Sequence, residues 1–270
     1  MSATKRPSEA LPIPDFRATL TPVDPFKFTT IAHRYMAICN PVATRAVDVC
    51  LEALAANDGD TVIDVGCGKG EMLIRLAEHH DIHGVGLDTN PAFLKIAEAE
   101  ATRRIGSGPS RATFQLIEAS QYAPAEPFAA AICFGSTHAF GDFRTAIRSL
   151  TRWVRPEGRI LIAEGYWKKD PDPEYLALLG AQRDELEDHA GNVALGVEAG
   201  LTPLLDRTTT LAEWDAYEDL YARSVEEYLV AHPQDPDADA MRDRIRAWRH
   251  GYLRWGRDTL GFGVYVFQKL

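Results

Sequence analysis

Apolar runs and helical patterns alternate through the middle of the chain. Short runs of β-branched and aliphatic residues predict buried strands, and apolar residues repeated every three to four positions predict amphipathic helices. Strands are predicted over residues 61–65, 83–88, 112–117, 128–134 and 158–164. Helices are predicted over residues 41–56, 70–79, 91–104 and 142–153. This alternation is typical of a parallel sheet covered by helices.

The two ends of the chain depart from this regular alternation. Strands are predicted near 203–209 and 262–268, and helical patterns fill the long stretch between them, about 211–256. Residues 1–24 contain four prolines and no periodicity, so we expect a mobile N-terminal arm over residues 1–25. One domain would then cover residues 26–270, with an N-terminal helical cap over residues 26–57.

A glycine turn follows the first predicted strand. Asp64 precedes glycines at 66, 68 and 70, and an apolar helical pattern begins directly after them. Glycine lets the backbone approach a ligand, and free N–H groups at a helix N-terminus attract anionic groups. The turn lacks the frame of a phosphate P-loop, and its third glycine comes one residue too early for a dinucleotide turn. A carboxylate beside the turn favours a ligand with positive as well as negative charge, and S-adenosylmethionine fits this description.

A second acid ends the strand predicted over 83–88. Asp88 lies 22 residues after Gly66, and an acid at about this distance is placed to accept hydrogen bonds from ribose hydroxyls. Nicotinamide cofactors and S-adenosylmethionine share this feature, since both carry an adenosine. The structural alternative is that Asp88 caps the helix that Pro91 begins.

These motifs resemble those of the class I S-adenosylmethionine-dependent methyltransferases. The matching segments are 62–70 (VIDVGCGKG) and 84–88 (GVGLD), supported by 114–119, 131–136 and 150–162. The resemblance is strong over about residues 40–165. It implies an α/β fold with a Rossmann-like, doubly wound, seven-stranded sheet. Such a sheet is mostly parallel, with an antiparallel last strand, and this chain would add a helical insertion between the last two strands.

The resemblance also implies which residues bind the cofactor. Asp64, Gly66 and Gly68 would hold its methionine end, Asp88 its ribose and Glu118 its adenine, although the family more often has Asp at this last position. The whole set expected at S-adenosylmethionine is Asp64, Gly66, Cys67, Gly68, Gly70, Asp88, Thr89, Asn90, Glu118, Ala119, Ser120, Phe134 and Gly135.

The reaction asks the protein to position a nucleophile and exclude water, because the cofactor supplies an activated methyl group. A hydroxyl or amine nucleophile would gain from a general base, and the candidates are His138, Glu164 and His33. We expect the insertion over 211–256 and the N-terminal segment 26–36 to form a lid over the acceptor. Aromatic side chains expected to bind the acceptor are Tyr166, Trp167, Trp214, Tyr217 and Tyr221. The alternative is that these rings fill the interface between insertion and sheet.

Composition excludes several other classes of protein. The whole net charge of −10 falls after residue 169, which argues against nucleic-acid binding, since that requires a broad basic surface. The four cysteines show no metal-binding spacing. No signal peptide and no run of 18 apolar residues is apparent, so we expect a cytoplasmic protein that does not enter a membrane. The apolar insertion could serve as the contact of a homodimer.

We therefore expect a methyltransferase that acts on a small molecule, apolar or aromatic, at an oxygen, nitrogen or carbon atom. Residues 134–138 read Phe-Gly-Ser-Thr-His where amino-methylating members often carry an Asn/Asp-Pro-Pro-Tyr/Phe motif, which disfavours DNA adenine or protein glutamine methylation. Two alternatives remain: a nicotinamide-dependent oxidoreductase, and a non-catalytic protein that binds S-adenosylmethionine.

Overall fold

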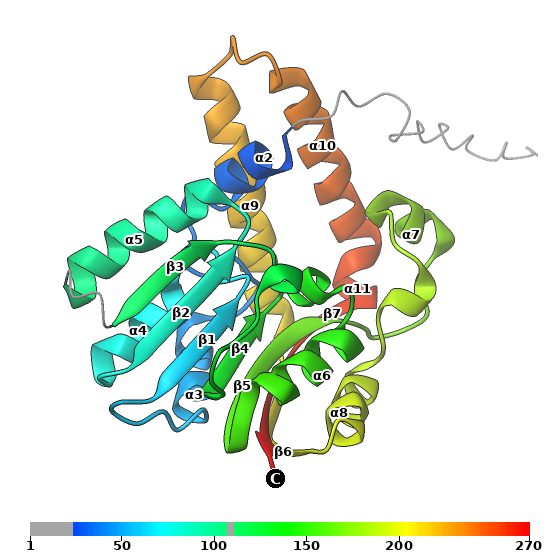
Figure 1. Cartoon of the computed structure of the whole chain (residues 1–270). Coiled ribbons are helices and arrows are strands. Elements are labelled where there is room, and N and C mark those ends of the chain that lie inside the picture. Colours follow the sequence, from blue (N-terminus) through cyan, green and yellow to red (C-terminus); the bar gives the residue numbers. More distant parts are fainter. Residues whose placement is uncertain (1–23, 107–110) are drawn as a thin grey trace, which may run out of the picture.

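The computed structural model describes residues 24–106 and 111–270. The arm predicted over residues 1–25 lies almost wholly outside them. Seven strands form one sheet in the order β3-β2-β1-β4-β5-β7-β6 (Figure 1). The strands are β1 (Thr61–Val65), β2 (His83–Asp88), β3 (Ala112–Leu116), β4 (Phe128–Phe134), β5 (Val154–Trp167), β6 (Leu201–Thr208) and β7 (Leu260–Lys269).

The strand directions confirm the predicted topology. Strands β1 to β5 pair in parallel, and β7 lies antiparallel between β5 and β6. The main difference is the start of β5, which begins at Val154 instead of 158. Its register against β4 shifts between Phe128 and Ala130, so the first residues of β5 form an irregular part of the strand.

Helices occupy most of the remaining chain. The predicted helix over 41–56 is shorter than expected, because it begins three residues later and ends at Glu52. The α-helices are α2 (Pro25–Ala32), α3 (Thr44–Glu52), α4 (Glu71–His79), α5 (Pro91–Ile105), α6 (Phe143–Trp153), α7 (Pro173–Leu179), α8 (His189–Glu198), α9 (Leu211–Ala231), α10 (Ala238–Gly251) and α11 (Arg257–Thr259). Short helical turns are η1 (Ala119–Gln121), η2 (Thr137–Phe140) and η3 (Arg183–Glu185), and a π-helical segment, η4, covers Tyr252–Gly256.

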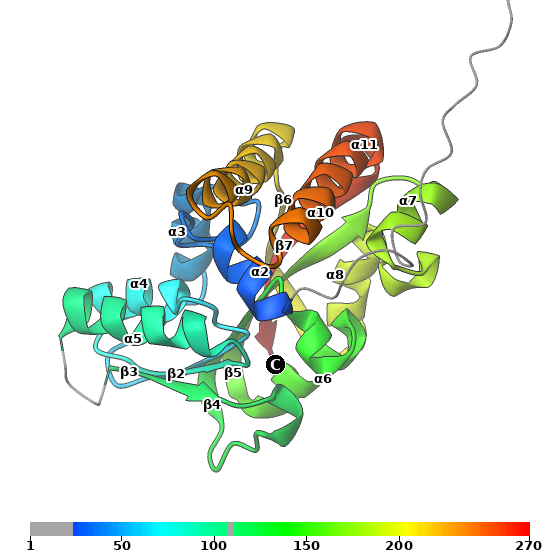
Figure 2. The same cartoon turned by 90° about the horizontal axis from the view of Figure 1, so that it is seen from above.

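Alternate residues of the central strands pack against the two helical layers. In β1, Val62 belongs to the core beneath α3 and α4, whereas Ile63 belongs to the core beneath α6 and α8. Figure 2 shows these layers on opposite sides of the sheet. Both faces of the central strands are buried, which explains why they appear in the sequence as continuous apolar runs.

A third hydrophobic core lies above the carboxyl ends of the parallel strands. It joins α2, α9 and α10 through Phe28, Ala222 and Met241, among others. Figure 1 shows α2, α9 and α10 together over the sheet. The ammonium group of Lys27 lies 2.6 Å from the carboxylates of both Asp235 and Asp237, which connects α2 to the turn between α9 and α10. We call α2, α9 and α10 together the cap, a set that differs from the N-terminal helical cap predicted over residues 26–57.

Candidate functional site

The glycine turn between β1 and α4 requires its glycines. Gly66, Gly68 and Gly70 all have positive φ angles, between 54° and 74°, which favour glycine. A Cβ atom on Gly66 would come 2.3 Å from that of Ser136, and one on Gly70 would come 2.6 Å from the ring of Phe114. A Cβ atom on Gly68 would meet only Phe93, at 3.9 Å. The first and third glycines therefore serve packing, and the second faces more open space.

Asp64 places a buried carboxylate beside this turn. Its side chain is 1% exposed, and neither oxygen has a hydrogen-bond partner among the described residues. Burial, and then the charge of Asp88, raise its pKa to about 8. A carboxylate without partners is costly in a protein interior, so the site fits a ligand that brings a cation or a donor. It lines a small cavity with Ala37, Ile38, Cys39, Asn40, Gly66, Cys67, Gly68, Lys69, Glu71, Met72 and Phe134.

Asp88 connects the end of β2 to the glycine turn. One carboxylate oxygen accepts a hydrogen bond from the N–H of Gly68 and the other from the N–H of Asn90, both at 2.8 Å. Each oxygen keeps a further lone pair that could accept a ribose hydroxyl. Asn90 is buried and caps α5, and its Nδ2 donates to Thr30 at 3.2 Å. Its visible role is thus structural, while Thr89 is exposed.

The other residues expected at the cofactor also lie near the carboxyl ends of the strands. Glu118 is exposed before η1 and accepts a hydrogen bond from the Ser120 hydroxyl at 3.3 Å, whereas Ala119 is buried in the core. A Cβ atom on Gly135 would come 2.0 Å from Nδ2 of Asn40, so the segment after α2 lies directly over the end of β4. Burial raises the pKa of the Cys67 thiol, which makes it an inert small residue.

Lys69, within the glycine turn, has a role that the sequence did not indicate. Its side chain is buried, and Nζ donates to the carbonyl oxygens of His33 and Met36, both at 2.7 Å. These carbonyls follow the last residue of α2, where a helix attracts cations. Lys69 therefore fastens the end of α2 to the cofactor turn. No local pattern predicts this contact, because its partners lie more than 30 residues away in sequence.

The three candidate bases have different surroundings. Nδ1 of His33 lies 2.9 Å from the carbonyl of Thr29, and its Nε2 lies 3.0 Å from the hydroxyl of Tyr217. Burial lowers its pKa to about 4, so the ring is neutral at pH 7. Glu164 accepts hydrogen bonds from the Thr137 hydroxyl and from the N–H of Gly165. His138 is exposed in η2.

The five aromatic residues expected at the acceptor fall into two groups. Tyr166 packs over Gly261, where a Cβ atom would come 2.2 Å from its ring. Trp167 is buried, and its indole N–H donates to the carbonyl of Arg183 at 2.9 Å. These two side chains therefore have clear packing roles around β5. The other three, Trp214, Tyr217 and Tyr221, lie on α9 of the cap. Trp214 packs against the core beneath α3 and α4, and Tyr221 packs against the core of the cap.

Sequence reasoning also missed Glu218 on α9. The side chain is 4% exposed, and one carboxylate oxygen accepts a hydrogen bond from Nε1 of Trp248 on α10 at 2.8 Å. Burial raises its pKa to about 7. Acids are common on exposed helix faces, so an acid in a helix does not by itself indicate a site. The one signal in the sequence is that Glu218 lies on the same helical turn as Tyr217 and shares a helix face with Trp214 and Tyr221.

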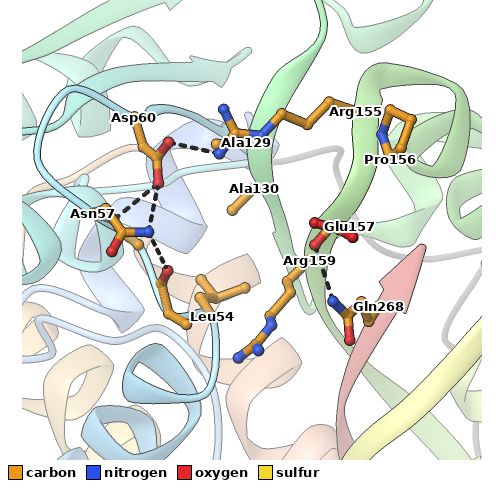
Figure 3. A pocket seen from close by; sticks show the side chains of 12 residues that line it. Leu54, Asn57, Asp60, Ala129, Ala130, Arg155, Pro156, Glu157, Arg159 and Gln268 are labelled. Carbon is orange, nitrogen blue, oxygen red and sulfur yellow. Dashed lines mark hydrogen bonds and ion pairs between the residues drawn. The ribbon is translucent and has the colours of Figure 1, made fainter. Parts of the chain in front are cut away.

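A second cavity lies at the opposite edge of the sheet, beside the amino ends of β1 and β4 (Figure 3). Its polar side chains bind one another or the backbone. Arg155 pairs with Asp60 at 2.8 Å, and Arg159 donates to the carbonyl of Ala53 at 2.8 Å. Ligands of open α/β sheets bind beyond the carboxyl ends of the strands, so we place the functional site at the glycine turn and not in this cavity.

Comparisons with known proteins show the family to which the chain belongs. A family model described as a methyltransferase domain matches residues 56–212. The chain is 27% identical over 239 residues to the protein YjhP of Escherichia coli K12, covering 88% of this chain and 96% of YjhP. No helix in the described part of the chain is long and apolar enough to cross a membrane.

Two solved structures are similar along nearly their whole length. One is an S-adenosylmethionine-dependent methyltransferase from Geobacter sulfurreducens in complex with S-adenosyl-L-homocysteine, with a TM-score of 0.83 and 28% identity over 90% of this chain and 98% of that one. The other is an S-adenosylmethionine-dependent methyltransferase from Thiobacillus denitrificans in complex with the same compound. It has a TM-score of 0.81 and 26% identity over 89% of this chain and 97% of that one.

Proposed function

Because this chain belongs to the methyltransferase-domain family, we propose that it methylates a small molecule held between the cofactor turn and the cap. The enzyme is an S-adenosylmethionine-dependent methyltransferase, as the family model and the two complexes with S-adenosyl-L-homocysteine indicate. Its acceptor, and the role of the cap as a lid over that acceptor, are our proposal.

The observation that carries the proposal is the unpartnered carboxylate of Asp64 beside the glycine turn. The ammonium group of the cofactor would satisfy this carboxylate, and the N-terminus of α4 would attract the cofactor's own carboxylate. Asp88 retains lone pairs for the ribose. A dinucleotide would bring its diphosphate close to Asp64 and offers no ammonium group to this acid, which argues against a nicotinamide-dependent oxidoreductase.

The cap supports a small acceptor. Trp214 on α9 packs against Phe262 with ring centroids 6.3 Å apart, and Phe262 packs against Phe134 at 5.9 Å. Phe134 in turn lines the cavity at the glycine turn. Aromatic side chains thus lead from the cofactor turn to the cap. A bound cofactor supplies an electrophilic methyl group, so the task left to these residues is to orient the acceptor and keep water away.

Substitution of Asp88 tests the cofactor site. We expect Asp88→Ala to weaken binding of S-adenosyl-L-homocysteine by about 10- to 100-fold, the scale of losing hydrogen bonds to a charged group, about 1–3 kcal/mol. Isothermal titration calorimetry measures this, and Glu98→Ala, at an exposed acid of α5, is the matched control. An unchanged dissociation constant for Asp88→Ala would contradict the ribose role. NADH binding at the same site would contradict the proposed cofactor.

A further inference from the structure

Glu218 faces the interior of the cap and forms no direct ion pair among the described residues, although the nearby guanidinium group of Arg249 lowers its pKa. Oε2 accepts the indole N–H of Trp248 at 2.8 Å. The indole N–H of Trp214, one helical turn earlier on α9, is buried and also lowers the pKa of this carboxylate, although it forms no hydrogen bond of ordinary geometry among the described residues. No lysine, arginine or histidine of the described chain forms an ion pair with Glu218. Such a carboxylate is expensive to keep ionised, unless a ligand brings the missing positive charge.

The charged and titratable groups around Glu218 come from every element that packs there. Asp219, its neighbour on α9, is paired with Arg249 of α10 at 2.8 Å. The charge of Arg249 lowers the pKa of Glu218 and that of Asp219 raises it, and both effects are smaller than that of burial. The other groups are the phenols of Tyr217, Tyr221, Tyr175 and Tyr252, whose pKa values are all raised by burial. They remain neutral at pH 7 and contribute rings instead of charges. Between pH 5 and 9, Glu218 is therefore the group of this cluster whose charge changes, with a pKa of about 7.

Trp248, which donates to the carboxylate, belongs to a cluster of aromatic rings on α9 and α10. The ring of Tyr221 lies 6.3 Å from that of Trp248 and 5.9 Å from that of Tyr217. Faces of aromatic rings attract cations, most strongly an ammonium ion that has lost its water. A carboxylate among such rings is complementary to an organic ammonium ion and offers much less to a neutral molecule.

The position of Glu218 also agrees with an acceptor site. Trp214 connects its helical turn to Phe262 and Phe134, and so to the cavity beside Asp64.

We propose that Glu218 binds the methyl acceptor, that this acceptor is an amine which arrives as its ammonium ion, and that Glu218 accepts its proton. The inference rests on the proposed function and adds the substrate class. The N–H bond of the ammonium ion breaks, the proton moves to a carboxylate oxygen of Glu218, and the bonding electrons stay on nitrogen as the lone pair of a neutral amine. That amine is the nucleophile which methyl transfer requires. The proton leaves for solvent once the product has dissociated, which restores the carboxylate.

A pair of probes that differ in charge tests this inference. Phenethylamine is an ammonium ion at neutral pH, and 2-phenylethanol is a neutral molecule of nearly the same shape. Each is titrated into protein saturated with S-adenosyl-L-homocysteine, with tryptophan fluorescence as the signal. At pH 8 we expect the amine to bind at least about 10-fold more tightly than the alcohol, as for a desolvated cation among aromatic rings and a carboxylate. The preference should shrink as the pH falls through about 7, because Glu218 then becomes neutral.

The variant Glu218→Gln keeps an oxygen that can accept the Trp248 N–H but has no charge, and we expect it to lose the preference for the amine. The matched control is Glu226→Gln, at an exposed acid of the same helix. Equal affinities in the unaltered protein, a preference that survives Glu218→Gln, or no binding of the amine at millimolar concentration would each overturn the inference. The dissociation constant of S-adenosyl-L-homocysteine, measured in the same samples, distinguishes failure of the proposed function from failure of the role of Glu218. If the unaltered protein does not bind this compound, the proposed function fails. If it binds and only the amine preference is missing, the role of Glu218 alone fails.

Discussion

At the scale of single residues, the site is defined by Asp64, a buried acid without a hydrogen-bond partner among the described residues. The pKa of Asp64 is raised to about 8 in the folded chain, from an ordinary value of 3.8. A raised carboxyl pKa means that the folded state binds the proton more tightly than the unfolded state. The contribution of Asp64 to stability is then greatest below pH 4 and declines as the pH rises to about 8, where the buried carboxylate is ionised.

Asp64→Asn should remove this loss of stability. We expect the ligand-free variant to gain roughly 2–5 kcal/mol in unfolding free energy over the unaltered protein at pH 8.5, and much less at pH 4.5. Its affinity for S-adenosyl-L-homocysteine should fall by about 10-fold or more, because an amide cannot match the ammonium charge. Urea denaturation at both pH values checks the first result and calorimetry the second. Asp81→Asn is the control, since that side chain is 69% exposed. If the unfolding free energies of Asp64→Asn and of the unaltered protein change with pH in parallel, the explanation is refuted.

At the scale of elements, Lys69 makes the cofactor turn and the end of α2 a single unit. Its ammonium group holds two carbonyls, of His33 and Met36, and the segment that follows them lines the cavity beside Asp64. The cofactor turn therefore depends on a segment of the chain that precedes the sheet.

Lys69→Met retains the apolar stem but removes the donors. We expect the protein to lose about 2–4 kcal/mol of stability, the scale for two hydrogen bonds from a charged group with partial compensation. Trypsin should cleave after Arg34 faster than in the unaltered protein, and mass spectrometry identifies the site. Lys95→Met, at an exposed position of α5, should leave cleavage at Arg34 unchanged. If the Lys69 variant resists trypsin equally well, the end of α2 is held by other contacts.

At the scale of the whole molecule, the cap has a hydrophobic core of its own and packs over the sheet. Phe28 is 1% exposed and belongs to the cap's own core, and the guanidinium group of Arg244 lies 4.1 Å from the centre of its ring. Such a separate core could loosen while the sheet stays folded, which would let an acceptor enter without disturbing the cofactor turn.

Phe28→Ala tests this independence. Loss of a buried phenylalanine costs about 3–5 kcal/mol, and we expect most of it to appear in the cap. Hydrogen–deuterium exchange should become faster in α2, α9 and α10, with β1 and β4 unchanged. Phe26→Ala removes a ring that is 40% exposed and should alter neither region. Faster exchange throughout the sheet would mean that cap and sheet unfold as one unit.

The sequence by itself determined the sheet and the cofactor turn, because both depend on local patterns. Each signal lies within about 30 consecutive residues. The signals are the alternation of strands and helices, the three spaced glycines, and an acid near the end of each of two strands. The antiparallel place of β7 came from the family resemblance and was confirmed by its pairing with β5 and β6.

Only the tertiary structure decided which polar side chains face one another. The partners of Lys69 and the Trp248 contact of Glu218 join positions 30 or more residues apart, and Trp167 proved to bond to the backbone at Arg183. Helical periodicity could place Glu218 and Tyr221 on one side of α9. It could not show that α10 packs against this side. Burial depends on what folds over a surface, and the charge that a buried acid can carry depends on burial.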